Sequence, residues 1–172
     1  MRMCACRGTA GFAHVSCLAE QAKLLVEEAE ENNLGREVIL SDPRFGKFSK
    51  CGLCEQEHYG DVRCALGWAC WKTYVGRPES EEIRWLALVQ VGIGLHDNAR
   101  YAEALVAFQG FLDYLRRHGA REEDTLCAQT NDANCLWRLG RADEGLRIER
   151  HVFSASREIS VSYTHLTLPT KA

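Results

Sequence analysis

The sequence predicts a mainly α-helical protein in which a small cysteine-rich finger segment precedes an antiparallel array of helical hairpins. Three observations support this fold class. Apolar residues recur at helical spacing through most of the 172 residues. One block of sequence recurs farther along the chain at a constant offset. Close pairs of cysteine and histidine residues gather between Cys4 and Cys54, ahead of the repeats.

The first helix is predicted after Cys17. Apolar residues there form one stripe, while most glutamates of the segment fall outside it, so the pattern predicts an amphipathic helix with an acidic solvent face. The sequence NNLG at 32–35 offers a stop, and Asp42-Pro43 offers a turn before the chain returns to Cys51. The stripe consists of Leu18, Ala22, Leu25, Val26 and Ala29.

From residue 61 onward the pattern is helical almost without a break, and it repeats. The hexapeptide RYAEAL at 100–105 matches RADEGL at 141–146, an offset of 41 residues between Arg100 and Arg141. Trp85, Ala87 and Leu95 match Leu126, Ala128 and Leu136 at that same offset. We therefore expect two helix–turn–helix units with turns at 98–100 and 140–141, preceded by a helix over 61–75 that belongs to an incomplete unit.

This repeated region resembles tetratricopeptide repeats (TPR) of the long, kinesin-light-chain type. The resemblance covers about residues 85–156 and depends on RYAEAL, GRADEGL and the glycine-bounded loops between helix pairs. It implies a TPR-like scaffold whose concave face holds a peptide or another protein. The alternative interpretation is a packed helical domain without that role.

Three close pairs of metal-ligating residues stand in the first part of the chain. Thiolate and imidazole are the ligands of structural zinc, which takes four of them in a tetrahedron and commonly receives them as close pairs. The order C-x-C-x7-H-x2-C, followed later by C-x2-C, therefore predicts structural zinc (Zn²⁺). The candidate ligands are Cys4, Cys6, His14, Cys17, Cys51 and Cys54.

This order resembles the last six ligands of the RING-CH (RING-variant) zinc finger, and CACRGTAGFAHVSCLAEQ at 4–21 also follows that family between the ligands. In the family, eight ligands bind two zinc ions in a cross-brace. The resemblance therefore implies one complete site, and a second site that holds His14 and Cys17 but lacks a C-x2-C pair before Cys4. The complete site would contain Cys4, Cys6, Cys51 and Cys54.

Two explanations of the missing pair are open: the sequence begins at an internal Met of a longer reading frame, or the finger is degenerate. All positions of a complete site are taken by protein ligands, so the metal would be structural and there are no catalytic residues in the finger. The remaining cysteines of the helical region are expected to be buried or half-buried thiols rather than ligands. These are Cys64, Cys70, Cys127 and Cys135.

The resemblance implies a ubiquitin ligase that docks a ubiquitin-conjugating enzyme and positions its thioester, while the helical repeats bind a protein substrate or adaptor. Such a finger would act through proximity and orientation. The alternative is a non-catalytic scaffold, in which a structural zinc finger caps the helical stack. Gln21 and Ala22 favour that alternative, because members of the family often carry Trp and an aliphatic residue there.

Composition limits the partners and the cellular location that we expect for the protein. A formal net charge of −3 argues against nucleic acid as a partner, and the most apolar run, over 85–95, is too short for a membrane span. Many cysteines without a secretory segment indicate a reducing, cytoplasmic location. We expect the finger over 1–60 and the repeats over 61–157. The stretch VSYTHLTLPTKA at 161–172 resembles read-through adaptor sequence and is expected to be a non-native tail.

Overall fold

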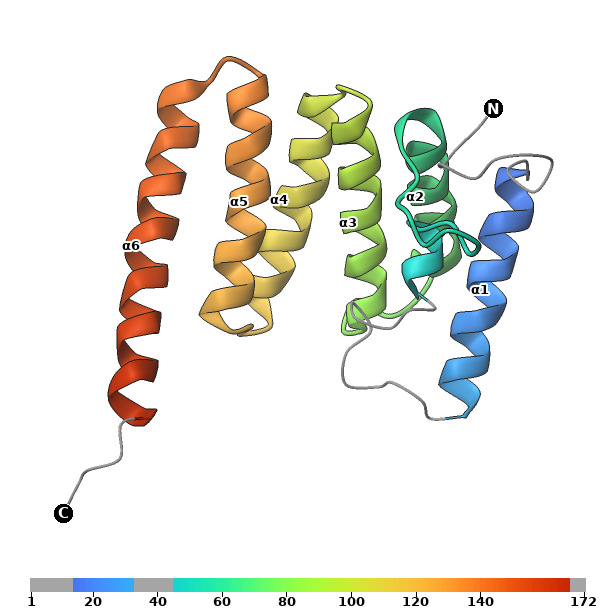
Figure 1. The fold of residues 1–172 in the computed structure, drawn as a ribbon, viewed down its shortest axis with the longest axis horizontal. Helices are drawn as coiled ribbons and strands as arrows, with labels where there is room; N and C mark the ends of the chain where they lie inside the picture. Colours follow the sequence, from blue (N-terminus) through green and yellow to red (C-terminus); the bar gives the residue numbers. More distant parts are fainter. Residues whose placement is uncertain (1–13, 33–44, 168–172) are drawn as a thin grey trace. The chain divides into compact units, whose positions relative to one another are not determined.

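The computed structural model describes residues 14–32 and 45–167, with side chains to residue 159. This part of the chain is mainly helical, as the sequence predicts, and its only β-type pairing is an isolated bridge between Lys50 and Glu57. No helix within it is long and apolar enough to cross a membrane. Figure 1 shows α1 (Val15–Glu31), η3 (Phe45–Phe48), α2 (Gly60–Tyr74), α3 (Glu82–Asp97), α4 (Tyr101–Arg117), α5 (Glu122–Arg138) and α6 (Ala142–Thr167).

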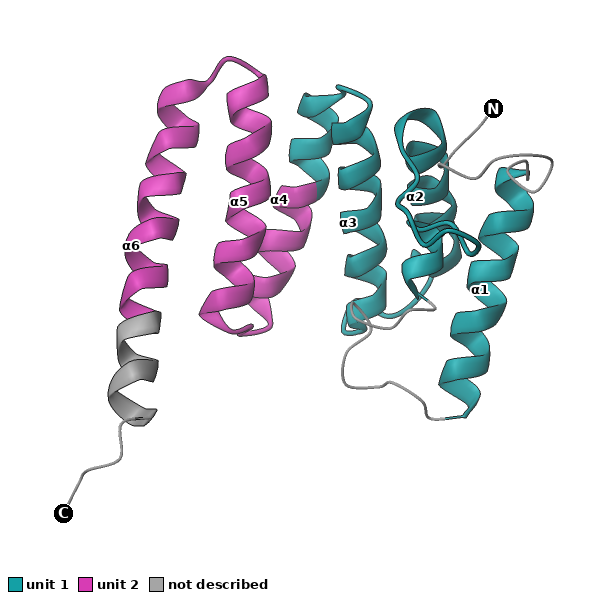
Figure 2. Cartoon of the chain, in the orientation of Figure 1, with its two compact units in different colours: residues 1–107 teal, residues 108–172 magenta. Residues whose placement is uncertain are grey.

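The chain forms two compact units, one ending at Ala107 and the other beginning at Phe108 (Figure 2). Helices α1, η3, α2 and α3 lie in the first unit, α5 and α6 lie in the second, and α4 contributes residues to both. The expected boundaries of the finger and the repeats stay predictions.

Helices α2 and α3 approach so closely that two glycines are required between them. A Cβ atom built on Gly67 would lie 2.5 Å from the carbonyl oxygen of Gln90 in α3. A Cβ atom on Gly94 of α3 would lie 2.7 Å from the Cα atom of Cys64 in α2. Real Cβ atoms do not come this close to backbone atoms, so only glycine permits this packing.

An aromatic cluster joins η3 to the end of α2. The rings of Phe45, Phe48 and Tyr74 lie with their centroids 6.0 to 6.3 Å apart, and each residue is at most 1% exposed. Such tilted and edge-to-face pairs add to the free energy gained from burying the rings. Arg63 of α2, 3% exposed, donates a hydrogen bond to the carbonyl oxygen of Phe48 at 3.4 Å.

Helix α1 packs against both α2 and η3. Its apolar stripe is buried at Ala22, Val26 and Ala29 as predicted, and most of its glutamates are exposed. The helix stops at the predicted place, where the side-chain amide of Asn32 donates to the carbonyl oxygen of Glu28 at 2.7 Å.

The turns that end α3 and α5 have the same backbone geometry, 41 residues apart. Ala99 and Gly140 both have positive φ, 58° and 75°. In each turn the next residue, Arg100 or Arg141, donates its N–H to a carbonyl oxygen five residues back, at 2.9 Å in both cases. These bonds satisfy carbonyls that the helix end would otherwise leave open.

Each following helix then begins with the same ion pair. Arg100 forms a two-bond fork with Glu103, at 2.8 and 2.5 Å, and Arg141 forms one with Glu144, at 2.6 and 2.7 Å. The residues that match at this offset in α3 and α5 are buried in both helices. The offset found in the sequence therefore corresponds to a repeated local structure.

Replacing Gly67 or Gly94 with Ala will destabilise the protein, by about 1–3 kcal/mol for an overpacked helix contact. In an ordinary helix the same change would stabilise the protein, because Ala favours a helix over Gly by about 1 kcal/mol. A loss of stability would therefore indicate the close contact of the two helices. Urea unfolding followed by circular dichroism measures the change.

The matched control is Gly145→Ala in α6, because a Cβ atom there would meet the Trp137 side chain at 3.1 Å and backbone, the Ala133 carbonyl oxygen, only at 3.3 Å. Trp137 is 42% exposed and its Nε1 atom donates to Glu149 at 2.8 Å, so we expect a smaller loss of stability than at Gly67 or Gly94. Gly67→Ala or Gly94→Ala proteins as stable as the wild type would show that α2 and α3 do not approach this closely.

Candidate functional site

The Cys51–Cys54 pair stands on a tight loop that the backbone closes on both sides. The Cys51 N–H donates to the carbonyl oxygen of Gln56 at 2.8 Å, and the Glu55 N–H donates to the carbonyl oxygen of Cys51 at 2.9 Å. Glu55, next to Cys54, has a positive φ of 58°. That conformation, unusual for a residue with a side chain, reverses the chain just after the second thiol. The loop therefore holds two potential thiolate ligands in one turn of the backbone.

His14 and Cys17 form a second pair at the start of α1. His14 is the residue before the first turn of the helix, and its Nδ1 atom lies 3.9 Å from Sγ of Cys17. Both residues are exposed. With Zn–S near 2.3 Å and Zn–N near 2.0 Å, a sulfur and a nitrogen ligand of a tetrahedral zinc stand about 3.5 Å apart. The spacing of His14 and Cys17 fits a shared zinc ion to within a few tenths of an ångström.

The structure does not assemble a complete metal site from described residues. Among these residues, no three side chains of His, Cys, Asp or Glu gather in a way that could hold an ion. Cys4 and Cys6 lie outside the described residues, so the four-ligand site that they would form with Cys51 and Cys54 stays a prediction.

Three of the four remaining cysteines are buried as predicted, namely Cys64, Cys70 and Cys135. Burial raises the pKa of the Cys135 thiol to about 11, so it is protonated at neutral pH. The prediction for Cys127 was wrong, because this residue is exposed. At 100° per residue it falls outside the apolar stripe that Leu126 and Leu136 share on α5.

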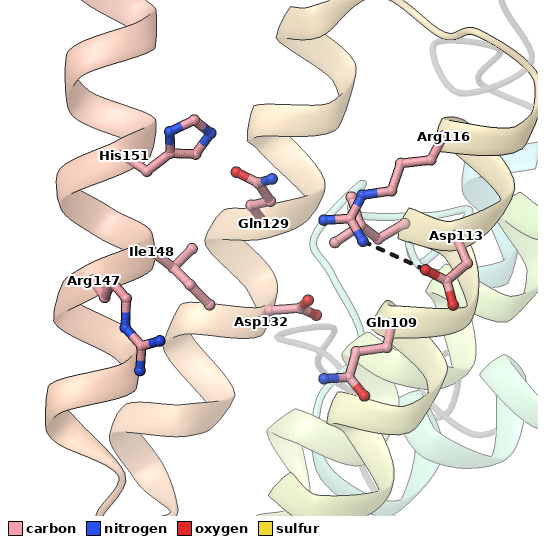
Figure 3. Close-up of a pocket in the computed structure, with 9 residues that line it drawn as sticks. Gln109, Asp113, Arg116, Gln129, Asp132, Arg147, Ile148 and His151 are labelled. Atoms are coloured by element: carbon pink, nitrogen blue, oxygen red, sulfur yellow. Dashed lines mark ion pairs between the residues drawn. The ribbon is translucent and has the colours of Figure 1, made fainter.

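Sequence analysis missed a pocket of about 470 Å³ in the second unit. Helices α4, α5 and α6 line it, and most of its lining is polar (Figure 3). Arg116 and Asp113 form an ion pair at 3.5 Å on its α4 side. The other lining residues are Gln109, Leu112, Gln129, Asp132, Arg147, Ile148 and His151.

Asp132 is the unusual residue of this pocket. It is 5% exposed, and its Oδ1 atom has no hydrogen-bond partner among the residues that the structure describes. Burial raises the pKa of Asp132 to about 6, while Arg116 lowers this pKa and Asp113 raises it. The 41-residue offset could have revealed the site, since it places Asp132 opposite Val91, which is 2% exposed. The chain thus puts a carboxylate where the preceding unit has an apolar side chain.

Comparisons with protein-family models, with curated proteins and with solved structures returned no match.

Protonation of Asp132 will make the stability of the protein depend on pH. Its pKa is about 6 in the folded chain and about 3.8 in the unfolded chain, so between these values the folded state binds more protons. Protonated Asp132 therefore stabilises the folded state relative to ionised Asp132. This stabilisation is fully present below about pH 4 and is lost as the pH rises through about 6. It amounts to at most about 3 kcal/mol.

Asp132→Asn removes this ionisable group. The unfolding free energy of the variant should therefore rise relative to that of the wild type between about pH 4 and pH 7. Urea unfolding at both pH values measures the difference, and Glu122→Gln, on an exposed residue of the same helix outside this pocket, is the control. A difference between Asp132→Asn and wild type that stays constant with pH would contradict the prediction.

Proposed function

We propose that this chain is a zinc-binding, RING-CH-type protein that acts in ubiquitin transfer and that its helical repeats bind a substrate or adaptor. The observation that carries the proposal is the Cys51–Cys54 loop, whose backbone bonds and left-handed Glu55 present two thiols from one tight turn. The His14–Cys17 pair, at a spacing that suits shared zinc ligation, supports it.

In this proposal Cys51 and Cys54 bind zinc together with Cys4 and Cys6, and His14 and Cys17 belong to the second site. Bound zinc would be structural and would tie the loop to the segment before α1. The protein itself would contribute proximity: it would hold a conjugating enzyme and a substrate together, with no covalent step on a finger side chain.

Two exposed apolar side chains next to the cysteine loop suit the docking of a conjugating enzyme. Leu53, between the two thiols, is 69% exposed, and Tyr59, just before α2, is 60% exposed. Apolar and aromatic side chains of this kind are the usual anchors of protein interfaces. Because Leu53 lies inside the loop, loss of zinc would also disorder this surface.

The second candidate function is a non-catalytic interaction scaffold with a structural zinc finger. The polar pocket of the second unit favours it, because this pocket offers a place for a partner that needs no ubiquitin transfer. Both functions require zinc in the finger, so zinc binding alone does not separate them. Ubiquitin discharge from a loaded conjugating enzyme does.

We expect the purified full chain to bind about one zinc ion at the Cys51 site, and Cys51→Ser should abolish this binding. Cys127→Ser is the matched control, since Cys127 is exposed and is not a proposed ligand. Zinc content by elemental analysis and release of zinc to a chromogenic chelator give the readout. Equal zinc content in the two variants would overturn the proposed site.

Leu53→Arg tests the ligase function separately from the metal. We expect the variant to keep its zinc and to lose at least about tenfold in the rate of ubiquitin discharge, which is the size of effect that a buried interface anchor has. Val106→Arg is the control, because Val106 is equally exposed, at 70%, but lies on α4 away from the finger sequence. Wild-type protein that binds zinc without accelerating discharge would instead support the scaffold.

A further inference from the structure

The pocket of the second unit has a negatively charged floor with unused hydrogen-bonding capacity. Asp132 is 95% buried and its Oδ1 atom accepts no hydrogen bond within the described structure. Gln129, one turn earlier on α5, also lines the pocket, and its buried Oε1 atom has no partner in the described part of the chain. A buried acceptor that gains no donor costs free energy, and an ionised one costs the most. The pocket is thus incomplete without a donor.

The cations that line the pocket do not supply this donor. Arg116 is engaged with Asp113 at 3.5 Å, and both side chains are more than half exposed. Arg147 and His151, on α6, are also exposed, so solvent screens the charge of Arg147 much more than that of Asp132. Figure 3 shows the Asp132 side chain directed from α5 toward α4, while Arg147 and His151 project from α6.

The size and the rim of the pocket indicate what would supply the donor. About 470 Å³ lies in the usual range for ligand pockets and far exceeds the roughly 30 Å³ of one water molecule. Gln109 and Gln129 place side-chain amides at the pocket, and amides can both donate to and accept from a peptide backbone. A floor that accepts and a rim that does both suit a charged side chain on a short extended peptide.

We propose that this pocket binds an arginine or lysine side chain of a peptide partner, with Asp132 as the carboxylate that receives the cation. The proposal extends the partner-binding role of the helical repeats and rests on that part of the proposed function only. It requires neither zinc nor ubiquitin transfer. Guanidinium and ammonium groups both donate to a carboxylate, and guanidinium can do so through two bonds.

The test is an NMR titration of the isotopically labelled full chain with Ac-Gly-Arg-Gly-NH2 and Ac-Gly-Lys-Gly-NH2 up to millimolar concentrations. We expect saturable shifts of backbone amides around Gln109, Gln129 and Asp132 with either cationic peptide. The matched peptides with Gln or Glu at the centre should not produce them. A chelator added to remove zinc should leave the shifts unchanged, which separates this proposal from the finger.

Asp132→Asn should weaken binding of the arginine peptide by at least about tenfold, as the loss of a charge-assisted bond predicts. Asp132→Val is a second variant with the same expected loss, and it is compatible with folding because Val91 occupies the matching position of the preceding unit. Glu123→Gln is the control: it makes the same charge change on α5 but outside this pocket.

Three results would overturn the proposal. Equal binding of the Gln-centred peptide, or no saturable shift at all, would show that the pocket does not select a cation. Preferred binding of the Glu-centred peptide would make it an anion site built on Arg116 and Arg147. Tighter binding of spermidine than of either cationic peptide would replace the peptide with a small polyamine as the occupant.

Discussion

The close contact of α2 with α3 is the constraint on which the first unit depends. Gly67 and Gly94 let the two backbones meet without side chains between them, and the residues around this contact are buried on both helices. Helix α2 also carries Tyr74 of the aromatic cluster and Arg63, which bonds to the backbone of η3. Because η3 directly precedes the Cys51–Cys54 loop, the position of α2 determines the position of that loop in the unit.

Acidic residues near this contact offset part of the cost of burying an arginine beside it. Arg63 is 3% exposed, and burial lowers its pKa, while Glu57 and Asp97 act in the opposite direction. Glu57 pairs with Lys50 across the cysteine loop, in the one β-type bridge of the described chain. The charge of Arg63 on α2 therefore interacts with a residue of the cysteine loop. The segment that carries the Cys51–Cys54 loop is therefore attached to α2 through a backbone-directed hydrogen bond and through charge as well as through apolar contact.

The two units carry different residues at the equivalent position of α3 and α5. Val91 fills it in the first and packs like any core residue, whereas Asp132 fills it in the second and raises the free energy of the folded state when ionised. Sites that break a local rule of packing are where function is expected. The repeat shows where the rule is broken, because it supplies the apolar residue that the position accepts.

Sequence periodicity alone determined most of the fold. The stripe of α1, its stop at Asn32, the helices from 61 onward and the matching turns at Ala99 and Gly140 are all present, because they depend on interactions within a few residues. Tertiary structure decided the rest. Residues distant in sequence create the contact of Gly67 with Gln90, the burial of Asp132 and the pocket around Asp132. The helical period of a sequence does not show which helix a buried face will contact. The exposure of Cys127 lies between these cases, since its place on the helix was available from the sequence but the direction of the core was not.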